Sequence, residues 1–430
     1  MKRLVYWMKL RGPDYILLRL KSLLSRYRFS PAMAEIRIME GVRALARHGA
    51  HPTFPTPGRV VANNGEFCRD LQRLGAEIAV HGYDHLDYRC LSRPAALRQL
   101  SRGKDAFRKN EIQVTGFRLP YLSQTEEFLR AVPRGMFEYS SNRAIWWDVV
   151  GKQSINGATA IFESLRRFYR AEPAEAMVAT PRRHDNLIEI PVSLPDDIQL
   201  HDGLNLGVDG MARAWVDMLR RIHERGELFV LMFHPELFER CTPALERTLQ
   251  AAADLQPGVW VARLRDISRW WNEKAGFTAR ISDDAQGLRI QFDCSERASI
   301  LVRNVDPGEA TEPWDGAYRR LKGQTITLPT GALPFIGVSD DLPEETGSFL
   351  REQGYILAAG EEADRCGLRL DSAIAARAGS EVGLIDFIET RDAPIARFWR
   401  WPDGAKSALA ITGDLDALSL FDYTSRLLAR

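Results

Sequence analysis

The first large segment of the chain alternates helical and strand-like patterns. From residue 31 to about residue 275, apolar positions at helical spacing are separated by short apolar runs. The predicted helices and strands include residues 32–47, 211–224, 77–80, 187–192 and 228–233. Helices that alternate with short apolar strands are typical of a parallel sheet covered by helices. We therefore expect an α/β domain with a mainly parallel sheet or barrel.

The pattern changes after residue 275. Residues 277–328 show strand-like alternation, for example at 288–292 and 300–303, which predicts a small β domain over 276–330. Beyond it, apolar runs accompany a predicted helix at 344–353, and these runs are residues 335–338, 355–357 and 383–386. We expect a small α/β unit over 331–399.

The tail returns to the first kind of pattern. Residues 407–412 are nearly all apolar, are followed by Gly413-Asp-Leu-Asp416, and precede a predicted helix from about residue 420. An apolar strand that ends in acidic residues is typical of a parallel α/β sheet. We therefore expect the tail to complete the first domain, which would consist of residues 1–275 and 400–430.

Composition and charge narrow the class of protein. The 430 residues are 45% hydrophobic and 27% charged, with a net charge of +1, as in an ordinary globular protein. This excludes a fibrous, collagenous or wholly disordered chain. With no overall positive field to attract it, nucleic acid is not an expected partner.

Cysteine usage and hydropathy suggest a compartment. The five cysteines are scattered, show no CxxC spacing, and are expected to be reduced. No apolar stretch approaches the roughly 18 residues needed to span a bilayer, and the N-terminus lacks the pattern of a secretory signal. We expect a cytoplasmic protein.

The first 28 residues form a local exception in charge. One acid, Asp14, stands among many basic residues, which are Lys2, Arg3, Lys9, Arg11, Arg19, Lys21, Arg26 and Arg28. From Tyr15 onward the apolar residues have the spacing of an amphipathic helix. This segment is either a solvated helix face or a contact with an anionic membrane surface or substrate.

Two short motifs could bind a metal ion. His81 and His85, in the sequence His-Gly-Tyr-Asp-His after an apolar run, have the spacing of one helical turn, so both nitrogens could reach one ion. Asp414 and Asp416 follow the apolar run of the tail and point to the same side, so that one could bind metal while the other stays a free base. A helix cap or a loop acid is the alternative for the two aspartates.

Two further motifs could act on a carbonyl group. In Gly116-Phe-Arg-Leu-Pro-Tyr121, Pro120 restricts the backbone so that the Tyr121 amide could donate to an oxyanion, and Arg118 could orient a carboxylate. His234-Pro235 ends the apolar strand 228–233, a position that suits a general acid. A plain surface turn and a buried histidine are the respective alternatives.

Taken together, these motifs resemble the polysaccharide deacetylases of carbohydrate esterase family 4, the NodB homology domain. HxxxH corresponds to His81 and His85, RxPY to Arg118–Tyr121, and the last motif to His234-Pro235. The motifs occur in the family's order. The resemblance implies a distorted (β/α)7-type barrel, here with an inserted small β domain and a small α/β unit.

The first family motif, an Asp pair after the first strand, is out of place. Residues 1–50 contain no apolar strand that ends in acids, whereas Asp414-Leu-Asp416 in the tail has this form. Either the chain is circularly permuted, so that the tail supplies the first strand, or the tail begins a second, truncated domain. We favour permutation because one copy of each motif then makes one complete site.

The resemblance also implies a role for each motif residue. Asp416, His81 and His85 would hold a divalent ion, expected to be Zn²⁺, while Asp414 would act as the base and His234 as the acid. The Tyr121 amide would stabilise the oxyanion. Arg118 and a late aspartate would orient the catalytic groups without contacting the metal. That aspartate lies in Ile188–Asp197 and is Asp197 or Asp196, with Asp197 taken here.

Further residues could line the cleft. Asn142, in Ser140-Ser-Asn142, and the pair Trp146-Trp147 are expected to contact substrate, and a Trp ring could stack on a sugar face. A core role is the alternative for the two tryptophans.

The implied reaction is metal-dependent hydrolysis of N-acetyl groups on an amino-sugar polysaccharide or glycan precursor. Its partner would be an N-acetylated glycan. Two alternatives stay open, namely a C–N hydrolase of a non-sugar amide on the same barrel and a non-catalytic glycan-binding protein.

Overall fold

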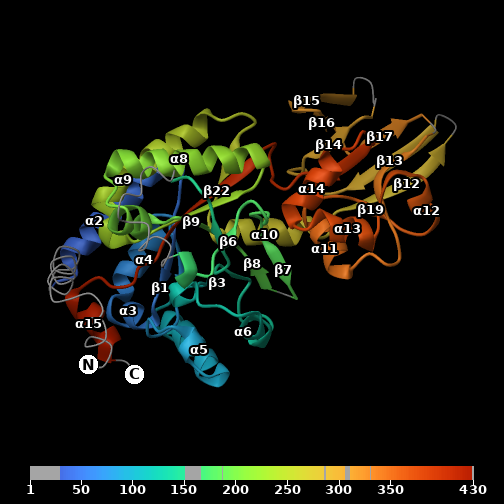
Figure 1. Cartoon of the computed structure of the whole chain (residues 1–430). Coiled ribbons are helices and arrows are strands. Elements are labelled where there is room, and N and C mark those ends of the chain that lie inside the picture. Colours follow the sequence, from blue (N-terminus) through green and yellow to red (C-terminus); the bar gives the residue numbers. More distant parts are fainter. Residues whose placement is uncertain are drawn as a thin grey trace.

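The computed structural model describes residues 30–150, 166–185, 187–284, 287–305, 310–329 and 331–428. The basic segment 1–28 lies outside this part of the chain. Figure 1 shows a larger body that contains the N-terminal elements together with the red strand and helix of the tail, and a smaller, mostly orange body beside it.

The larger body is built on a curved, mainly parallel sheet. Its main strands are β1 (Thr53–Thr56), β2 (Glu77–Val80), β3 (Gly116–Phe117), β4 (Tyr139–Ser140), β8 (Leu187–Glu189), β9 (Val192–Leu194), β10 (Leu228–Phe233) and β22 (Ser407–Gly413). They are hydrogen-bonded in the order β9-β10-β22-β1-β2-β3-β4-β8, with parallel neighbours throughout. Only Ile190 and Pro191 separate β8 from β9, so the two ends of the row meet.

The sheet is therefore a distorted α/β barrel. If β8 and β9 count as one interrupted strand, the described residues form seven barrel strands. Four short strands extend the sheet outside them: β5 (Ala144–Trp146), β6 (Glu172–Pro173), β7 (Arg182–His184) and β11 (Val259–Val261). Of these, β7 is antiparallel to β8, and β11 is parallel to β22. The expected fold class is confirmed.

The tail strand β22 lies in the middle of this sheet. It pairs with β10 from Ala408 to Gly413 on one side, and with β11 and the first residue of β1 on the other. All of its residues are buried, which explains the continuous apolar run, because helices or core cover both faces of a central parallel strand.

Helices surround the barrel (Figure 1). They are α2 (Ala32–Ala46), α3 (Gly58–Asn63), α4 (Gly65–Arg73), α5 (Arg93–Lys109), α6 (Glu126–Ala131), α8 (Val208–Arg225), α9 (Phe238–Asp254), α10 (Leu264–Lys274) and α15 (Leu420–Leu428). Short turns are η1 (Tyr88–Cys90), η2 (Pro120–Leu122), η4 (Ile198–Gly203) and η5 (Pro235–Leu237). Helix α8 buries Met211, Trp215 and Ile222 on one face and ends at Gly226, whose φ of 66° closes the helix without strain.

The smaller body contains three sheets. Strands β12 (Thr278–Asp284), β13 (Gly287–Asp293) and β17 (Thr325–Leu328) form one antiparallel sheet. A second contains β14 (Ile300–Arg303), β15 (Thr311–Asp315), β16 (Tyr318–Leu321) and β21 (Ile395–Phe398). The third, parallel sheet contains β18 (Leu333–Val338), β19 (Leu357–Ala358) and β20 (Cys366–Leu370), with α11 (Glu344–Glu352), α12 (Glu361–Asp364), α13 (Ser372–Ala378) and α14 (Glu381–Glu389).

Two details of the smaller body differ from the sequence pattern. Strand β21 lies within 331–399, the range expected for the α/β unit, yet it pairs with β14 of the β domain. The apolar run 383–386 lies in helix α14. The two units therefore share a strand.

Among the described residues, no helix combines the length and the apolar character that crossing a bilayer requires.

Candidate metal centre and active site

The candidate residues gather at one edge of the barrel. Each group follows the C-terminal end of a parallel strand: Asp196 and Asp197 after β9, His234 after β10, Asp414 and Asp416 after β22, His81 and His85 after β2, and Arg118 and Tyr121 after β3. The C-terminal ends of parallel strands lie at the same edge, which is where α/β barrels place their functional groups.

His81 and His85 converge through a loop. The HxxxH spacing predicted a helical turn, but residues 81–87 are not helical. Gly82, with φ of 72°, turns the backbone in a conformation that glycine adopts easily. The two rings lie 5.1 Å apart between centroids. The prediction of a helical turn was wrong, because the loop bend and not helical periodicity brings the imidazoles together.

Asp84 fixes this loop from within. Its buried carboxylate accepts hydrogen bonds from Arg59 Nε at 2.7 Å and from Gln99 Nε2 at 3.2 Å. The Asp84 amide donates to Gln99 Oε1 at 3.0 Å. Sequence reasoning did not single out these three residues, although the position of Asp84 between the two histidines was a signal.

Asp416 from the tail joins the two histidines. Its Oδ1 atom lies 3.1 Å from His85 Nε2 and 3.5 Å from His81 Nε2. One ligand atom from each residue lies within 4.8 Å of the others. Ligand atoms about 2.1 Å from a tetrahedral ion would be about 3.4 Å apart, so this spacing is that of a metal-binding group.

The state of His81 also fits a metal ligand. Its Nδ1 is 2.9 Å from the Arg118 carbonyl oxygen, so Nδ1–H donates there and leaves the lone pair on Nε2. Nε2 is buried and makes no hydrogen bond within the described residues. Burial lowers the pKa of His81 against the opposing effect of Asp414 and Asp416, which favours the neutral, ligating form. Two imidazoles and one carboxylate suit a divalent ion such as Zn²⁺.

Arg118 holds the second carboxylate, that of Asp414. The fully buried guanidinium donates from Nη1 to Asp414 Oδ1 at 2.7 Å and to Thr412 Oγ1 at 3.1 Å. Nε and Nη2 bind the carbonyl oxygen and the hydroxyl group of Ser141, each at 3.0 Å. The other Asp414 oxygen, Oδ2, lies 3.9 Å from His81 Nε2. Asp414 is thus oriented toward the histidines without joining their closest group.

Asn142 supports the Arg118 loop from behind. Its side-chain Oδ1 accepts from the backbone amide of Leu119 at 2.6 Å. Its backbone amide donates to Glu189 Oε1 at 2.6 Å. The buried Glu189 also accepts from Ser140 and Arg143, and burial raises its pKa. Asn142 is 1% exposed and positions the RxPY loop, while its contact with substrate stays a prediction.

His234 forms a buried pair with Asp197. Nδ1 of His234 lies 2.8 Å from Asp197 Oδ1, and the His234 amide donates to Oδ2 at 2.8 Å. Burial alone would lower the pKa of His234, but the Asp197 carboxylate outweighs it and raises that pKa well above its ordinary value. At neutral pH His234 is therefore an imidazolium whose Nε2 can donate a proton.

The geometry separates Asp196 from Asp197. Asp196 Oδ1 accepts from the backbone amide of Gln199 at 2.8 Å, whereas Asp197 contacts His234. Burial and the charge of Asp197 raise the pKa of Asp196 to about 7. Of the two aspartates, Asp197 is thus the one in contact with His234, and its role as the late aspartate stays a prediction.

An aromatic wall stands beside the two histidines. Tyr121 has φ of 61°, and its ring lies edge-on to His85 with centroids 4.6 Å apart. On its other side lies Phe168 at 5.8 Å, followed by Tyr169. Burial and the charges of Asp196 and Asp414 raise the pKa of Tyr169 well above its ordinary value. Nothing in the sequence pattern had marked Phe168 or Tyr169.

Trp146 and Trp147 are core residues. Their exposed fractions are 4% and 3%, and both belong to the hydrophobic core of the barrel. Strand β5 is parallel to β9 and pairs Trp146 with Leu194, so the two tryptophans stand at the same edge as Asp196 but one strand further out. This burial favours the core role for the two tryptophans, and their stacking on a sugar face stays a prediction.

Comparison with known proteins finds a family that resembles part of the barrel. Residues 37–137 match the family model described as polysaccharide deacetylase, a range that contains His81, His85, Arg118 and Tyr121. No curated protein was found to match the chain.

Solved structures that are similar to part of the chain include three proteins. One, from Mycobacterium smegmatis, is assigned as a polysaccharide deacetylase, with 21% identity, a TM-score of 0.44, and coverage of 56% of this chain and 78% of that chain. Another so assigned, from Pseudomonas aeruginosa, has 17% identity, a TM-score of 0.43, and coverage of 56% and 72%. An allantoinase has 16% identity, a TM-score of 0.44, and coverage of 59% and 76%. Over residues 37–137, the chain is thus similar to polysaccharide deacetylases.

Proposed function

We propose that the barrel hydrolyses N-acetyl groups on an amino-sugar polysaccharide or glycan precursor in a metal-dependent reaction. The observation that carries this proposal is the arrangement at the barrel edge. His81, His85 and Asp416 form a ligand group beside a second carboxylate, Asp414, and the His234–Asp197 pair follows the adjacent strands.

His81, His85 and Asp416 would hold the ion, with Zn²⁺ preferred by this donor set. When bound, a divalent ion supplies Lewis acidity, which polarises a carbonyl oxygen and lowers the pKa of water. Three protein ligands leave positions for water and substrate, as in catalytic rather than structural sites.

Asp414 would accept the proton of the attacking water. Its Oδ1 is held by Arg118 at 2.7 Å, which leaves Oδ2 to take the proton. The pair with Arg118 also prevents the carboxylate from rotating into the ligand group. Arg118 thereby acts as a positioning residue.

His234 would donate a proton to the leaving amine. The contact with Asp197 keeps the ring protonated and fixes Nδ1–H, so Nε2–H is the proton that can be transferred. The Tyr121 amide, in the left-handed turn after Pro120, would stabilise the developing oxyanion. Tyr121, Phe168 and Tyr169 would form one wall of the sugar site, because an aromatic surface suits a sugar ring.

The test is acetate release from oligomers of N-acetylglucosamine by the zinc-loaded chain. We expect turnover that His85→Ala abolishes and that Asp209→Asn, an exposed acid paired with Arg247, leaves unchanged. Hydrolysis of small cyclic amides without acetate release would instead favour the non-sugar alternative. Binding of the oligomers without turnover would favour the glycan-binding alternative.

We also propose a cytoplasmic location and a contact of residues 1–28 with an anionic membrane surface. The scattered cysteines without CxxC spacing support the first, and the excess of basic residues among residues 1–28 supports the second.

A further inference from the structure

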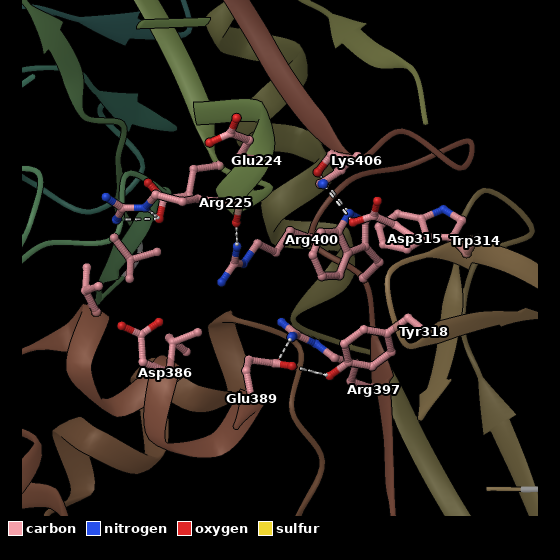
Figure 2. Close-up of a pocket in the computed structure, with 15 residues that line it drawn as sticks. Glu224, Arg225, Trp314, Asp315, Tyr318, Asp386, Glu389, Arg397, Arg400 and Lys406 are labelled. Carbon is pink, nitrogen blue, oxygen red and sulfur yellow. Dashed lines mark hydrogen bonds and ion pairs between the residues drawn. The ribbon is translucent and has the colours of Figure 1, made fainter. Parts of the chain in front are cut away.

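A cavity lies between the barrel and the smaller body (Figure 2). Its volume is about 290 Å³, which is at the small end of ligand-binding cavities. It is lined by residues from the end of α8, from β15 and β16, from α14 and from the segment 397–406. Each structural unit of the chain thus contributes to it.

This cavity is separate from the candidate metal centre. Glu227 precedes β10 and Lys406 precedes β22, whereas His234 and Asp414 follow the same two strands. Strands of six or seven residues span roughly 20 Å, so the cavity lies at the opposite end of the barrel.

Most charges of the cavity wall are paired. Three ion pairs account for them: Arg225 Nη2 to Glu227 Oε1 at 2.7 Å, Arg397 Nη1 to Glu389 Oε1 at 2.9 Å, and Lys406 Nζ to Asp315 Oδ2 at 2.7 Å. Glu389 also binds Arg303 and two tyrosine hydroxyl groups. Glu227, Asp315 and Glu389 are therefore each paired with a cation other than Arg400.

Arg400 is the cation of this wall that belongs to none of these ion pairs. Its side chain is 2% exposed, and Nη1 donates only to the carbonyl oxygens of Arg225 and Gly226, at 2.8 and 3.2 Å. Within the described residues it forms no ion pair, and its buried Nε has no hydrogen-bond partner. Figure 2 shows its guanidinium reaching into the space that Arg397 and Glu389 border from the other side. Burial and the charge of Arg397 lower the pKa of Arg400 to about 10, so it is still charged at neutral pH.

Glu227 and Glu389 partly offset the charge of Arg400, but neither lies within ion-pair distance of it, so this buried position still favours an anion. The rest of the wall limits which anion fits. Trp314, Tyr318 and Trp399 supply aromatic surface, which suits the body of a small ring compound. Glu224 and Asp386 are exposed carboxylates of the same wall and would repel a second negative charge.

We propose that this cavity binds a small ring compound with one carboxylate group, such as a uronic acid, with the carboxylate on Arg400. The ring would lie against the aromatic side chains. The site is independent of the proposed deacetylation, because none of its residues belongs to the metal centre.

The test is isothermal titration calorimetry of the zinc-loaded full chain at pH 7 with three probes. We expect glucuronate to bind, neutral glucose not to bind, and glucose 6-phosphate, which carries nearly two charges, to bind more weakly than glucuronate. Arg400→Gln should weaken glucuronate binding about tenfold or more, since a charged hydrogen-bond partner is lost. Arg280→Gln, an exposed arginine paired with Asp293 on β12 and β13, is the matched control and should not change it.

Several results would overturn the proposal. They are the absence of glucuronate binding, equal or tighter binding of glucose 6-phosphate, and glucuronate binding that survives Arg400→Gln. Binding that survives would place the carboxylate elsewhere, for example on the zinc ion.

A second variant tests the same proposal if Arg400→Gln does not fold. Asp315 is partly exposed, and Asp315→Asn would release Lys406 from its ion pair at the cavity wall. The freed ammonium group should tighten glucuronate binding. Unchanged or weaker binding in Asp315→Asn would contradict an anion site at this position.

Discussion

Two aspartates that stand two residues apart receive different environments. Asp416 lies closest to the two histidines, whereas Asp414 is held by Arg118. Their spacing indicated that both side chains leave the strand on one side. The spacing did not indicate which aspartate lies by the histidines, and that assignment came from the family resemblance. Arg118, which holds Asp414, is distant in the sequence and reaches it only across the folded barrel.

Asp414→Asn should separate the base from the ligand. The substitution keeps the shape and removes the basicity, so turnover should fall by about 10² to 10⁴ while the metal stays bound. Asp416→Asn should lose the metal. Metal content and acetate release, measured on both variants, check this, and the reverse pattern would show that the two roles are exchanged.

Asp197→Asn should change the pH dependence of the reaction. In the native protein Asp197 raises the pKa of His234, so the acid stays protonated at neutral pH and is lost as pH rises through that raised pKa. Without this carboxylate, burial lowers the pKa of His234. The alkaline limb of kcat/KM should therefore move to lower pH by about one unit or more. An alkaline limb that stays in place would remove His234 as the acid.

The His234–Asp197 pair also links stability to pH. Because the folded-state pKa of His234 is raised, the stability it contributes is fully present below the unfolded-state pKa and is lost as pH rises through the folded-state value. The same loss should be smaller in Asp197→Asn, which lacks the pair.

Among the elements, strand β22 connects the tail to the active site. It is central in the sheet, and β10, β11 and β1 pair with it. Its all-apolar sequence made this placement predictable, since such a run has to be covered on both faces. The helical turn at His81–His85 was not predictable in this way, because the spacing of two side chains does not distinguish a helix from a bent loop.

Deletion of residues 405–430 should destabilise the barrel as a whole. It removes a buried strand and leaves β10 and β1 with unpaired edges. Calorimetry should show loss of the cooperative transition or a markedly lower Tm, whereas deletion of residues 425–430 alone should have a small effect. A full-length Tm with the metal retained after the larger deletion would show that the tail does not complete the barrel.

At the scale of the whole molecule, the division into a barrel and smaller units follows from the change of pattern near residue 275. The sharing of β21 between the smaller units depends on a pairing between distant segments, which local pattern does not encode. The prediction that Trp146 and Trp147 line the substrate cleft was also made from local pattern alone. Aromatic residues suit both a sugar site and a core, and only the burial of both rings in the folded chain favours the core.

Metal binding should stabilise the whole barrel, since the ligands come from both ends of the sequence. A ligand that binds only the folded state at 100 times its Kd adds about 2.7 kcal/mol. Zinc should therefore raise the Tm of the EDTA-treated chain by several degrees, and this shift should be absent in His85→Ala. An equal shift in both proteins would place the ion elsewhere.

The most direct test of the central claim is the zinc content of the purified chain at neutral pH, measured by mass spectrometry after equilibrium dialysis. If histidines from the N-terminal part and an aspartate from the tail form one site, the native chain should bind one ion. His81→Ala and Asp416→Asn should each lose it, while Asp209→Asn should keep it. A native chain without zinc, or an Asp416→Asn variant that binds zinc as tightly as the native chain, would contradict the account.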